Sequence, residues 1–212
     1  MSAFPPNISY RELTIHDYGT LRILGSQCLP LPYPDTYWLN IATDSDNHYS
    51  LGKLTFANII RNCNGRFFLM LSGAYNQDNK LVGAIGVVRN VKDYFAMNYM
   101  HPEERKLVYN YKKTCYITTL IVAAEYRKIG IATQLLQRAS TVLLQEGSHL
   151  IYLHVLHSNY PAIRLYEKMG YQKFCEIPGY YTINGVQETG YVYCRRLAEP
   201  FCHQCVSGCS IS

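Results

Sequence analysis

A strand-to-helix junction in the middle of the chain constrains its fold more than any other segment. Tyr116–Val122 is an apolar, β-branched run typical of a buried strand, and Ile131–Gln145 carries its apolar residues at the spacing of an amphipathic helix. Between them stands the sequence Arg127-Lys128-Ile129-Gly130-Ile131-Ala132. A helix that starts directly after a strand points its free backbone N–H groups and the positive end of its dipole at one spot. The junction therefore predicts a binding site for a phosphate-bearing cofactor.

The residues of this loop suit a diphosphate. Gly130 allows the backbone to approach the ligand closely, and the small side chain of Ala132 allows the first helical turn to lie against it. Arg127 and Lys128 add positive charge. The alternative is an ordinary tight turn with solvated cations, and Lys128 fits that alternative best. The cofactor-binding residues predicted at this junction are Arg127, Lys128, Gly130, Ile131, Ala132 and Thr133.

Length and composition are those of a globular protein with one domain. The chain has 212 residues, of which 48% are hydrophobic and 17% are charged, enough for one well-buried domain but hardly for two. No apolar run approaches the roughly 20 residues that a membrane-spanning helix needs. Residues 1–6 lack the basic and apolar regions of a signal peptide. We therefore expect a cytoplasmic protein whose eight cysteines are mostly reduced.

The charge of the chain argues against one class of partner. The net charge of +5 suits an anionic cofactor or an acidic protein surface. The basic residues are too few and too scattered for nucleic-acid binding, and they form no stripe with aromatic residues. We therefore expect no nucleic-acid partner.

The pattern of apolar residues predicts an α/β fold. Strands are expected at Asn7–Ile15, Arg66–Tyr75, Lys80–Val91, Tyr116–Val122, His149–Leu156, Tyr171–Ile177 and Gly190–Arg196. Helices are expected from Asp17 to Ser26, from Asp35 onward, and at Ile131–Gln145 and Tyr160–Met169. Val91–Lys113 and Pro178–Glu188 are expected to be loops, and residues 198–212 a flexible tail. The sequence thus predicts about seven strands and about four helices in a domain that covers residues 1–197.

A second motif follows one helix and one strand after the first. It reads Asn159-x-x-Ala162-x-x-Leu165-Tyr166-x-x-x-Gly170-Tyr171, an Asn at a helix start followed by apolar residues at helical spacing and a glycine stop. Together with Arg127-x-x-Gly130-x-Ala132 after a strand, this motif resembles the GCN-related N-acetyltransferase (GNAT) superfamily. The resemblance implies acetyl-CoA as the cosubstrate. It also implies a GNAT fold, a mixed central sheet in which two adjacent parallel strands splay apart to admit the cofactor.

The resemblance further implies roles for single residues around the cofactor. The main-chain N–H groups of Leu120 and Val122 would hold the pantetheine arm and the developing oxyanion. Asn159 would contact the cofactor chain. Tyr166 would hydrogen-bond the CoA sulfur and protonate the departing thiolate. Ile121 departs from the superfamily pattern, because relatives usually have glycine there, and a β-branched residue can change the bulge of the strand.

A closer resemblance comes from three further segments. Tyr116, Tyr152-Leu153-His154-Val155 and Pro178-Gly179-Tyr180-Tyr181 resemble protein N-terminal acetyltransferases. The loops at 29–35 and 180–186 are most similar to the NatF class, the Golgi-associated N-alpha-acetyltransferases. The resemblance covers about residues 8–197. It implies direct attack by a protein's N-terminal amine on the acetyl thioester in a ternary complex, with a preference for Met-initiated N-termini.

The resemblance identifies Tyr116 and His154 as the pair that removes the proton from the α-amine, through ordered water. An α-amine has a pKa of about 8, so a weak base is enough to remove the proton of its ammonium form and produce the free nucleophile. A neutral His can accept that proton, whereas a Tyr with a pKa of about 10 is better suited to orient the water. The alternative for His154 is a core histidine whose hydrogen bonds are satisfied. Tyr166 completes the predicted catalytic set.

The acceptor pocket is expected between two rigid loops. Leu29, Pro30 and Tyr33 come from the proline-rich loop, and Tyr180 and Tyr181 come from the late loop. Their apolar and phenolic faces would enclose the Met side chain and reject internal lysines through narrowness. The alternative for Tyr180 and Tyr181 is packing within a hairpin. Two other functions stay open, a lysine or histone acetyltransferase and a catalytically inactive acetyl-CoA-binding module.

The last residues leave the location of the protein open. The tail contains Cys202, His203, Cys205 and Cys209, whose spacing is not that of a recognised zinc finger, so no metal site is predicted. Reversible S-acylation of these cysteines would provide a membrane anchor, on the cytosolic face of the Golgi by the NatF resemblance. The remaining alternative is an unstructured tail on a cytoplasmic enzyme. We expect a monomer whose partners are protein or peptide N-termini.

Overall fold

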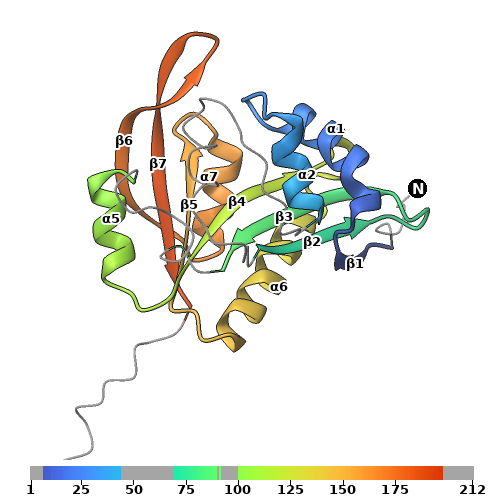
Figure 1. Ribbon diagram of the computed structural model, residues 1–212, viewed down its shortest axis with the longest axis horizontal. Coiled ribbons are helices and arrows are strands. Elements are labelled where there is room, and N and C mark those ends of the chain that lie inside the picture. Colours follow the sequence, from blue (N-terminus) through green and yellow to red (C-terminus); the bar gives the residue numbers. More distant parts are fainter. Residues whose placement is uncertain (1–6, 44–68, 90, 92–99, 198–212) are drawn as a thin grey trace, which may run out of the picture.

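The computed structural model describes residues 7–43, 69–89, 91 and 100–197 (Figure 1). In chain order the elements are β1 (Ser9–Glu12), α1 (Tyr18–Cys28), α2 (Asp35–Thr43), β2 (Leu69–Tyr75), β3 (Leu81–Val88), α5 (Pro102–Tyr109), β4 (Thr114–Val122), α6 (Ile131–Gln145), β5 (Leu150–Leu156), α7 (Tyr160–Lys168), β6 (Gln172–Ile183) and β7 (Val186–Arg196). Short 3₁₀ helices at Ile15–Asp17 and Ala124–Tyr126 precede α1 and α6. The predicted tail at 198–212 and residues 66–68 of the predicted second strand lie outside the described residues.

The strands form one seven-stranded mixed sheet in the order β1-β2-β3-β4-β5-β7-β6. β4 and β5 are parallel, and every other neighbouring pair is antiparallel. Helices cover both faces of the sheet (Figure 1). One core, which contains Trp38, Tyr116 and Tyr152, lies between the sheet and α1, α2 and α5, and a second core lies under α6 and α7. The predicted α/β class with about seven strands is confirmed.

The two parallel strands diverge after a short paired stretch. β4 pairs with β5 from its start at Thr114 only as far as the pair Ile117–Leu153. Beyond that pair, β4 stays in the sheet through β3 as far as Val122, and β5 stays in it through β7 as far as Leu156. The facing edges of β4 and β5 therefore have no strand partner over this stretch. This is the splayed arrangement that the resemblance predicted.

A bulge in β4 lies next to this divergence. The register of β4 against β3 shifts so that Thr118 is an extra residue, and its hydroxyl donates a hydrogen bond of 3.2 Å to the backbone oxygen of Gly86. Ile121, where relatives usually have glycine, pairs regularly with Ala84 and is only 2% exposed. The β-branched residue therefore leaves the ladder intact at its own position, and the bulge lies nearer the start of the strand.

The prediction of a loop over Val91–Lys113 is wrong for part of that segment. Pro102–Tyr109 forms α5, so the described residues contain five α-helices rather than about four. The side chain of His101 caps the helix, a proline occupies its first turn, and acidic residues there complement the helix dipole. The many charged residues of the segment obscured its short apolar face, Leu107 and Val108, which is buried in the core.

The predicted loop Pro178–Glu188 is also wrong, because β6 and β7 continue through it as a long hairpin. The strands are joined by Asn184-Gly185, whose φ angles of 52° and 79° are those of a tight two-residue hairpin turn. The pairing is interrupted twice, between Lys173 and Cys175 and, over a longer stretch, between Ile177 and Tyr181. The prediction gave too much weight to the proline and glycine at 178–179 and too little to the Asn-Gly turn signal.

The other predicted elements differ from the observed ones mainly at their ends. α6 spans the predicted Ile131–Gln145, and the predicted helix at Tyr160–Met169 is α7. The opening strand is shorter than the predicted Asn7–Ile15, because the chain turns at Ile15–Asp17 into a 3₁₀ helix that leads to α1. Strand and helix types agree with the prediction in each of these cases.

Candidate active site

Tyr116 and His154, the predicted proton-abstracting pair, lie together where the parallel strands diverge. Tyr116 is paired within the short β4–β5 ladder, and His154 is the first residue of β5 beyond it. The Tyr116 hydroxyl and the His154 Nδ1 atom are 3.2 Å apart, a hydrogen-bond distance. Tyr116 is 4% exposed, and the side chain of His154 is 3% exposed. The structure therefore brings the two residues into direct contact at the opening between the strands.

The ring of Tyr180 covers one face of His154. The two rings stack with a centroid distance of 4.2 Å and an interplanar angle of 6°. Two glycines permit this placement. Gly179 has a φ of +67°, which favours glycine, and Gly190 of β7 lacks the Cβ atom that would lie 2.9 Å from the Tyr180 Cβ. The ring of Tyr181 packs edge-on against the ring of Tyr180, with their centroids 4.8 Å apart.

A carboxyl group that the sequence did not indicate completes this cluster. Glu104 of α5 is 8% exposed, and its Oε1 atom accepts a hydrogen bond of 2.9 Å from the Tyr152 hydroxyl. Its Oε2 atom lies 3.7 Å from His154 Nε2. Glu104 stands 48 positions before Tyr152 in a charged segment, so no local pattern marks it as a site residue. The sequence signal that could have found it is the helix start at His101 and Pro102, because it places the glutamates that follow in the first turn of a helix rather than in a loop.

Burial dominates the electrostatics of the cluster. Desolvation raises the pKa of Glu104 to about 7, against a smaller opposite effect of the Tyr152 hydrogen bond. Desolvation also lowers the pKa of His154 to about 3, with a contribution from nearby His101, and it raises the pKa of Tyr116 well above its usual range. The 3.7 Å contact would be an ion pair only if the imidazole were protonated. At neutral pH it joins a neutral imidazole to a carboxyl group.

The predicted phosphate loop has the geometry of an anion site. Gly130 is the N-cap of α6 with a φ of +93°, and a Cβ atom there would meet no atom within 4 Å. Lys128, which also has a positive φ of 67°, and Arg127 are exposed beside it. The Arg127 Nε atom donates to the backbone oxygen of Val122 at 3.0 Å, so its side chain lies against the end of β4. Open space, a free helix start and two cations fit a diphosphate.

The backbone N–H groups of Leu120 and Val122 face the opening between β4 and β5. The N–H of the next residue, Ala123, donates to the backbone oxygen of Val82 at 2.8 Å and so points toward β3. The N–H and C=O of one strand residue point to the same edge, and successive residues alternate between edges. The backbone oxygen of Val122 accordingly accepts from Arg127 rather than from β3. The predicted oxyanion donors therefore lie on the strand edge that faces a cofactor.

The remaining predicted cofactor residues are divided between surface and core. The side chain of Ile131 is 2% exposed in the core, so only its backbone can meet a ligand, whereas Ala132 and Thr133 are partly exposed in the first turn of α6. The side-chain oxygen of Asn159 caps α7 by accepting from Ala162 N at 3.3 Å. The amide N–H groups of Asn159 are exposed and can still donate to a ligand.

Tyr166 lies apart from the Tyr116–His154 pair. It belongs to the core under α6 and α7, whereas Tyr116 belongs to the core on the opposite face of the sheet. Burial raises the pKa of Tyr166 above its usual range, so its hydroxyl keeps its proton at neutral pH. This position suits a donor to the sulfur of a cofactor and not a base for the acceptor amine.

The two loops predicted to bind the acceptor lie on the same face of the sheet as the catalytic pair. Leu29, Tyr33 and Tyr180 are partly buried against the core that contains this pair. Burial raises the pKa of Tyr180 and of Tyr181, and nearby Tyr33 adds to both rises, which indicates that the proline-rich loop lies close to the hairpin. Pro30, the fifth predicted acceptor residue, is exposed in the same loop.

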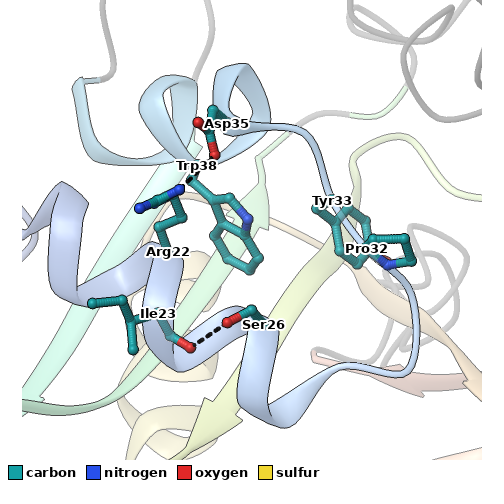
Figure 2. A pocket seen from close by; sticks show the side chains of 7 residues that line it. All are labelled: Arg22, Ile23, Ser26, Pro32, Tyr33, Asp35 and Trp38. Carbon is teal, nitrogen blue, oxygen red and sulfur yellow. Dashed lines mark hydrogen bonds and ion pairs between the residues drawn. The ribbon is translucent and has the colours of Figure 1, made fainter.

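A separate pocket lies on the outer side of the proline-rich loop (Figure 2). Its volume is about 280 Å³, and it is lined by Arg22, Ile23, Ser26, Pro32, Tyr33, Asp35 and Trp38. Figure 2 shows the ion pair between Arg22 and Asp35, 3.2 Å long, beside the indole ring of Trp38. Neither Tyr116 nor His154 lines this pocket, so it is not the site of the proton transfer.

Across residues 7–43, 69–89, 91 and 100–197, no group of histidine, cysteine and acidic side chains could hold a metal ion. None of the helices in this part of the chain combines the length and the hydropathy that a membrane span requires. The tail cysteines lie outside these residues.

Comparison with known sequences identifies the family. Residues 32–171 match the sequence profile of the Acetyltransferase (GNAT) family, which is more than half of the chain. N-alpha-acetyltransferase 60 of Xenopus tropicalis is 28% identical over 190 residues, which cover 86% of this chain and 67% of that protein. An N-alpha-acetyltransferase of Saccharolobus solfataricus is 42% identical over 67 residues, which cover 31% of this chain and 40% of that protein.

Solved structures agree with this chain at the level of the fold. The crystal structure of Arabidopsis thaliana NAA60 in complex with a bisubstrate analogue matches with a TM-score of 0.65 at 22% identity, over 90% of this chain and 98% of that chain. Arabidopsis thaliana Naa50 in complex with the bisubstrate analogue CoA-Ac-MVNAL matches with a TM-score of 0.60 at 23% identity, over 89% of this chain and 97% of that chain. These matches confirm the predicted fold. With the profile match over residues 32–171, they show that the chain belongs to the Acetyltransferase (GNAT) family.

Proposed function

We propose that this chain transfers the acetyl group of acetyl-CoA to the N-terminal α-amine of proteins or peptides. The observation that carries the proposal is the 3.2 Å contact between the Tyr116 hydroxyl and His154 Nδ1 beside the opening between β4 and β5. A pair that can take up a proton thus stands next to the strand edge that carries the expected thioester-binding N–H groups. The relatives named N-alpha-acetyltransferase support the same donor and acceptor.

Acetyl-CoA supplies an activated acyl group, and the chain supplies the rest of the chemistry. The N–H groups of Leu120 and Val122 stabilise the negative charge that develops on the acetyl oxygen as the amine attacks. Tyr116 keeps its proton because burial raises its pKa, so it orients the amine or its water, and the lone pair of His154 Nδ1 accepts the proton that Tyr116 passes on. Tyr166, whose pKa burial also raises, donates a hydrogen bond or a proton to the leaving thiolate.

The surroundings of the pair favour a narrow and largely apolar acceptor pocket. Leu29, Tyr33 and Tyr180 each pack against the core on the face of the sheet where the amine must arrive. Their apolar surfaces suit the side chain of an N-terminal Met followed by a hydrophobic, small or basic residue. The same narrowness disfavours an internal lysine, whose flanking peptide would have to enter with it.

A peptide panel tests the acceptor. The full chain is incubated with acetyl-CoA and a Met-initiated peptide, with the same peptide blocked at its N-terminus and carrying one internal lysine, and with a Ser-initiated peptide. Mass spectrometry then locates the acetyl group. We expect acetylation of the free α-amine of the Met-initiated peptide. Acetylation confined to internal lysines would establish the rival lysine acetyltransferase instead.

Two variants distinguish an enzyme from an inactive acetyl-CoA-binding module. His154→Ala and Tyr116→Phe should each lower kcat about 100-fold, because each removes a step of proton transfer. The Kd for CoA should stay within about two-fold, since neither residue belongs to the phosphate loop at the start of α6. Unchanged rates in both variants would reject the pair. Tight CoA binding by a wild-type chain that acetylates nothing would favour the inactive module.

We also propose that the enzyme is a cytoplasmic monomer that associates with the cytosolic face of the Golgi through its tail. The proposal rests on the NatF resemblance and on the tail cysteines, which lie outside the described residues. Cell fractionation of the full chain, and of a chain with Cys202, Cys205 and Cys209 replaced by Ser, tests it. Membrane association that survives these replacements would rule out the acylated tail as the anchor.

A further inference from the structure

We propose that Glu104 is the terminal proton acceptor of a relay that runs from Tyr116 through His154. This inference rests on the proposed function, because it concerns how the same site removes the proton of the acceptor amine. Glu104 acts through His154, so it is a positioning residue rather than a group that touches the substrate. Its helix, α5, lies in a segment that the sequence pattern described as a loop.

The three groups form a continuous line across three elements of the fold. The Tyr116 hydroxyl on β4 lies 3.2 Å from His154 Nδ1, and Nε2 on the other side of the same ring lies 3.7 Å from Glu104 Oε2 on α5. Within the described part of the chain, His154 Nε2 is buried without a hydrogen-bond partner. A buried N–H that lacks a partner is costly, and the carboxylate is the acceptor that faces it. Catalytic contacts of this length commonly shorten when substrate binds.

The carboxyl group is held by its other oxygen. The hydroxyl of Tyr152 donates to Glu104 Oε1 at 2.9 Å, and Tyr152 is itself fully buried. With Oε1 occupied, Oε2 is directed at His154. A carboxylate in this place favours the tautomer with the proton on Nε2, which leaves the lone pair on Nδ1 to accept from the Tyr116 hydroxyl. Glu104 therefore determines which nitrogen of His154 can receive a proton from the substrate side.

The relay consists of three linked transfers. An N–H bond of the substrate ammonium breaks as an O–H bond forms on Tyr116. The original O–H bond of Tyr116 breaks as an N–H bond forms on His154 Nδ1, and the Nε2–H bond breaks as an O–H bond forms on Glu104 Oε2. The ammonium becomes a neutral amine, and the Glu104 carboxylate becomes a carboxylic acid. After product release the transfers run in reverse: Glu104 returns its proton to Nε2, the Nδ1 proton passes back to Tyr116, and Tyr116 loses a proton to solvent, which restores the carboxylate and the starting tautomer.

The electrostatics of the cluster fit this direction of transfer. Because burial lowers the pKa of His154 to about 3, its imidazole ring is neutral at neutral pH and does not keep a second proton. Because burial raises the pKa of Glu104 to about 7, its carboxylate takes up a proton near the pH at which the α-amine must lose one. The other titratable groups facing His154 and Glu104 are Tyr116, Tyr152, Tyr180, Tyr181, His101 and Cys175. Burial raises the pKa of each of these tyrosines and of the cysteine, so they stay protonated.

The pH dependence of kcat/KM tests the relay. The log kcat/KM of the wild-type enzyme on a Met-initiated peptide should rise with a slope of about 1 and level off near pH 7, because Glu104 must be ionised to take up the proton of the substrate ammonium. Glu104→Gln should move this acidic limb to about pH 8, where the α-amine loses its proton in solution, and should lower kcat about 100-fold. The Gln side chain can still accept from Tyr152, but its N–H₂ group faces Nε2 and imposes the opposite tautomer on His154.

Two further variants complete the test. Glu103→Gln is the matched control, because Glu103 belongs to the same helix but pairs with Lys106 at the surface at 2.6 Å, and this variant should keep the wild-type rate and slope. Tyr152→Phe removes the hydrogen bond that lowers the pKa of Glu104, so the acidic limb should move to higher pH. The Kd for CoA and the far-UV spectrum report whether each variant is folded.

The outcomes separate this inference from the function on which it rests. A folded Glu104→Gln enzyme with the wild-type acidic limb and rate overturns the relay. If Glu104→Gln does not fold, an acidic limb that stays in place in Tyr152→Phe overturns it. A wild-type chain that acetylates no peptide α-amine contradicts the proposed function itself, whereas an active wild type with an unaffected Glu104→Gln contradicts only the relay.

Discussion

The position of Tyr180 depends on two residues that have no side chain. Pairing between β6 and β7 stops at Ile177 and resumes at Tyr181, so three residues of β6 oppose one residue of β7. This wide bulge, with Gly179 at a φ of +67°, lets the Tyr180 ring stack on His154, and Gly190 leaves room for it. The backbone conformation of this hairpin therefore determines where the Tyr180 ring lies against the Tyr116–His154 pair.

Replacing Gly190 by Ala should displace the Tyr180 ring. The new Cβ would lie 2.9 Å from both Cβ and Cδ1 of Tyr180, which is too close for either to stay in place. We expect kcat/KM to fall about 10-fold and the free energy of unfolding to fall by about 1–2 kcal/mol, as in other overpacked sites. The Kd for CoA should not change. Steady-state kinetics, calorimetry and urea unfolding measure the three quantities.

Gly19→Ala in α1 is the control for this prediction. A Cβ atom at position 19 would meet no atom within 4 Å, and the residue lies far from β6 in the chain. Gly19→Ala should therefore keep full activity. If Gly190→Ala kept full activity as well, Tyr180 would have no part in the reaction.

At the scale of elements, the start of α6 is where cofactor binding and helix geometry coincide. Gly130 adopts a φ of +93° as the N-cap, which turns the chain from the 3₁₀ helix after β4 into α6. This conformation leaves the first N–H groups of the helix free to bind an anion. The left-handed conformation of Gly130 therefore both starts the helix and exposes the N–H groups of the predicted phosphate site.

Gly130→Ala should weaken CoA binding as well as folding. A left-handed backbone costs a residue with a Cβ about 1–2 kcal/mol, and the relaxed loop would no longer present its N–H groups together, so the Kd for CoA should rise about 10-fold. Gly147→Ala is the matched control, because Gly147 follows the other end of α6 with a φ of +74°. It should lose similar stability and keep its CoA affinity. Equal CoA affinity in both variants, measured by calorimetry, would contradict the assignment of the loop.

The elements that could be predicted from sequence are those whose ends are marked locally. α6 and α7 follow start signals at Gly130 and Asn159 and carry apolar residues at helical spacing, so their ranges agreed with the structure. α5 and the β6–β7 hairpin could not be predicted in the same way. Only two residues of α5 are apolar and buried, and the bulge of the hairpin places Tyr180 against His154 of β5, a contact that no local pattern records.

At the scale of the whole molecule, some of the site residues could be predicted from the sequence and one could not. Tyr116 and His154 could be predicted to meet, because they lie on neighbouring parallel strands next to a recognisable motif. Glu104 could not, because its significance comes from burial against Tyr152 and His154, far away in the chain. A carboxyl group of this kind is identified by its environment and not by its neighbours in sequence.

Glu104 should also affect how stability depends on pH. Its pKa is raised from 4.5 to about 7 in the folded protein, so its contribution is fully present below about pH 4.5 and is lost as the pH rises through 7. The loss amounts to about 3 kcal/mol. His154, whose pKa is lowered, has the opposite slope, but it is common to both proteins when the wild type is compared with Glu104→Gln.

Urea unfolding near pH 5 and near pH 8 measures this difference. We expect Glu104→Gln to be about 2–3 kcal/mol more stable than the wild type near pH 8 and about equally stable near pH 5, because only the wild type must bury a charge at the higher pH. An equal difference at the two pH values would show that Glu104 has the same pKa in the folded and the unfolded protein, and would contradict the rise caused by burial.

The short ladder between β4 and β5 divides the molecule into two half-sheets. Strands β1 to β4 form one half and β5 to β7 the other, and pairing from Thr114 to Ile117 is all that joins them within the sheet. Tyr116 belongs to the first half, whereas His154 and Tyr180 belong to the second. Tyr116 lies within the ladder and His154 follows it directly, so their contact lies where the two halves are joined. A molecule that enters the gap beyond the ladder therefore occupies the space between the halves without separating these two residues.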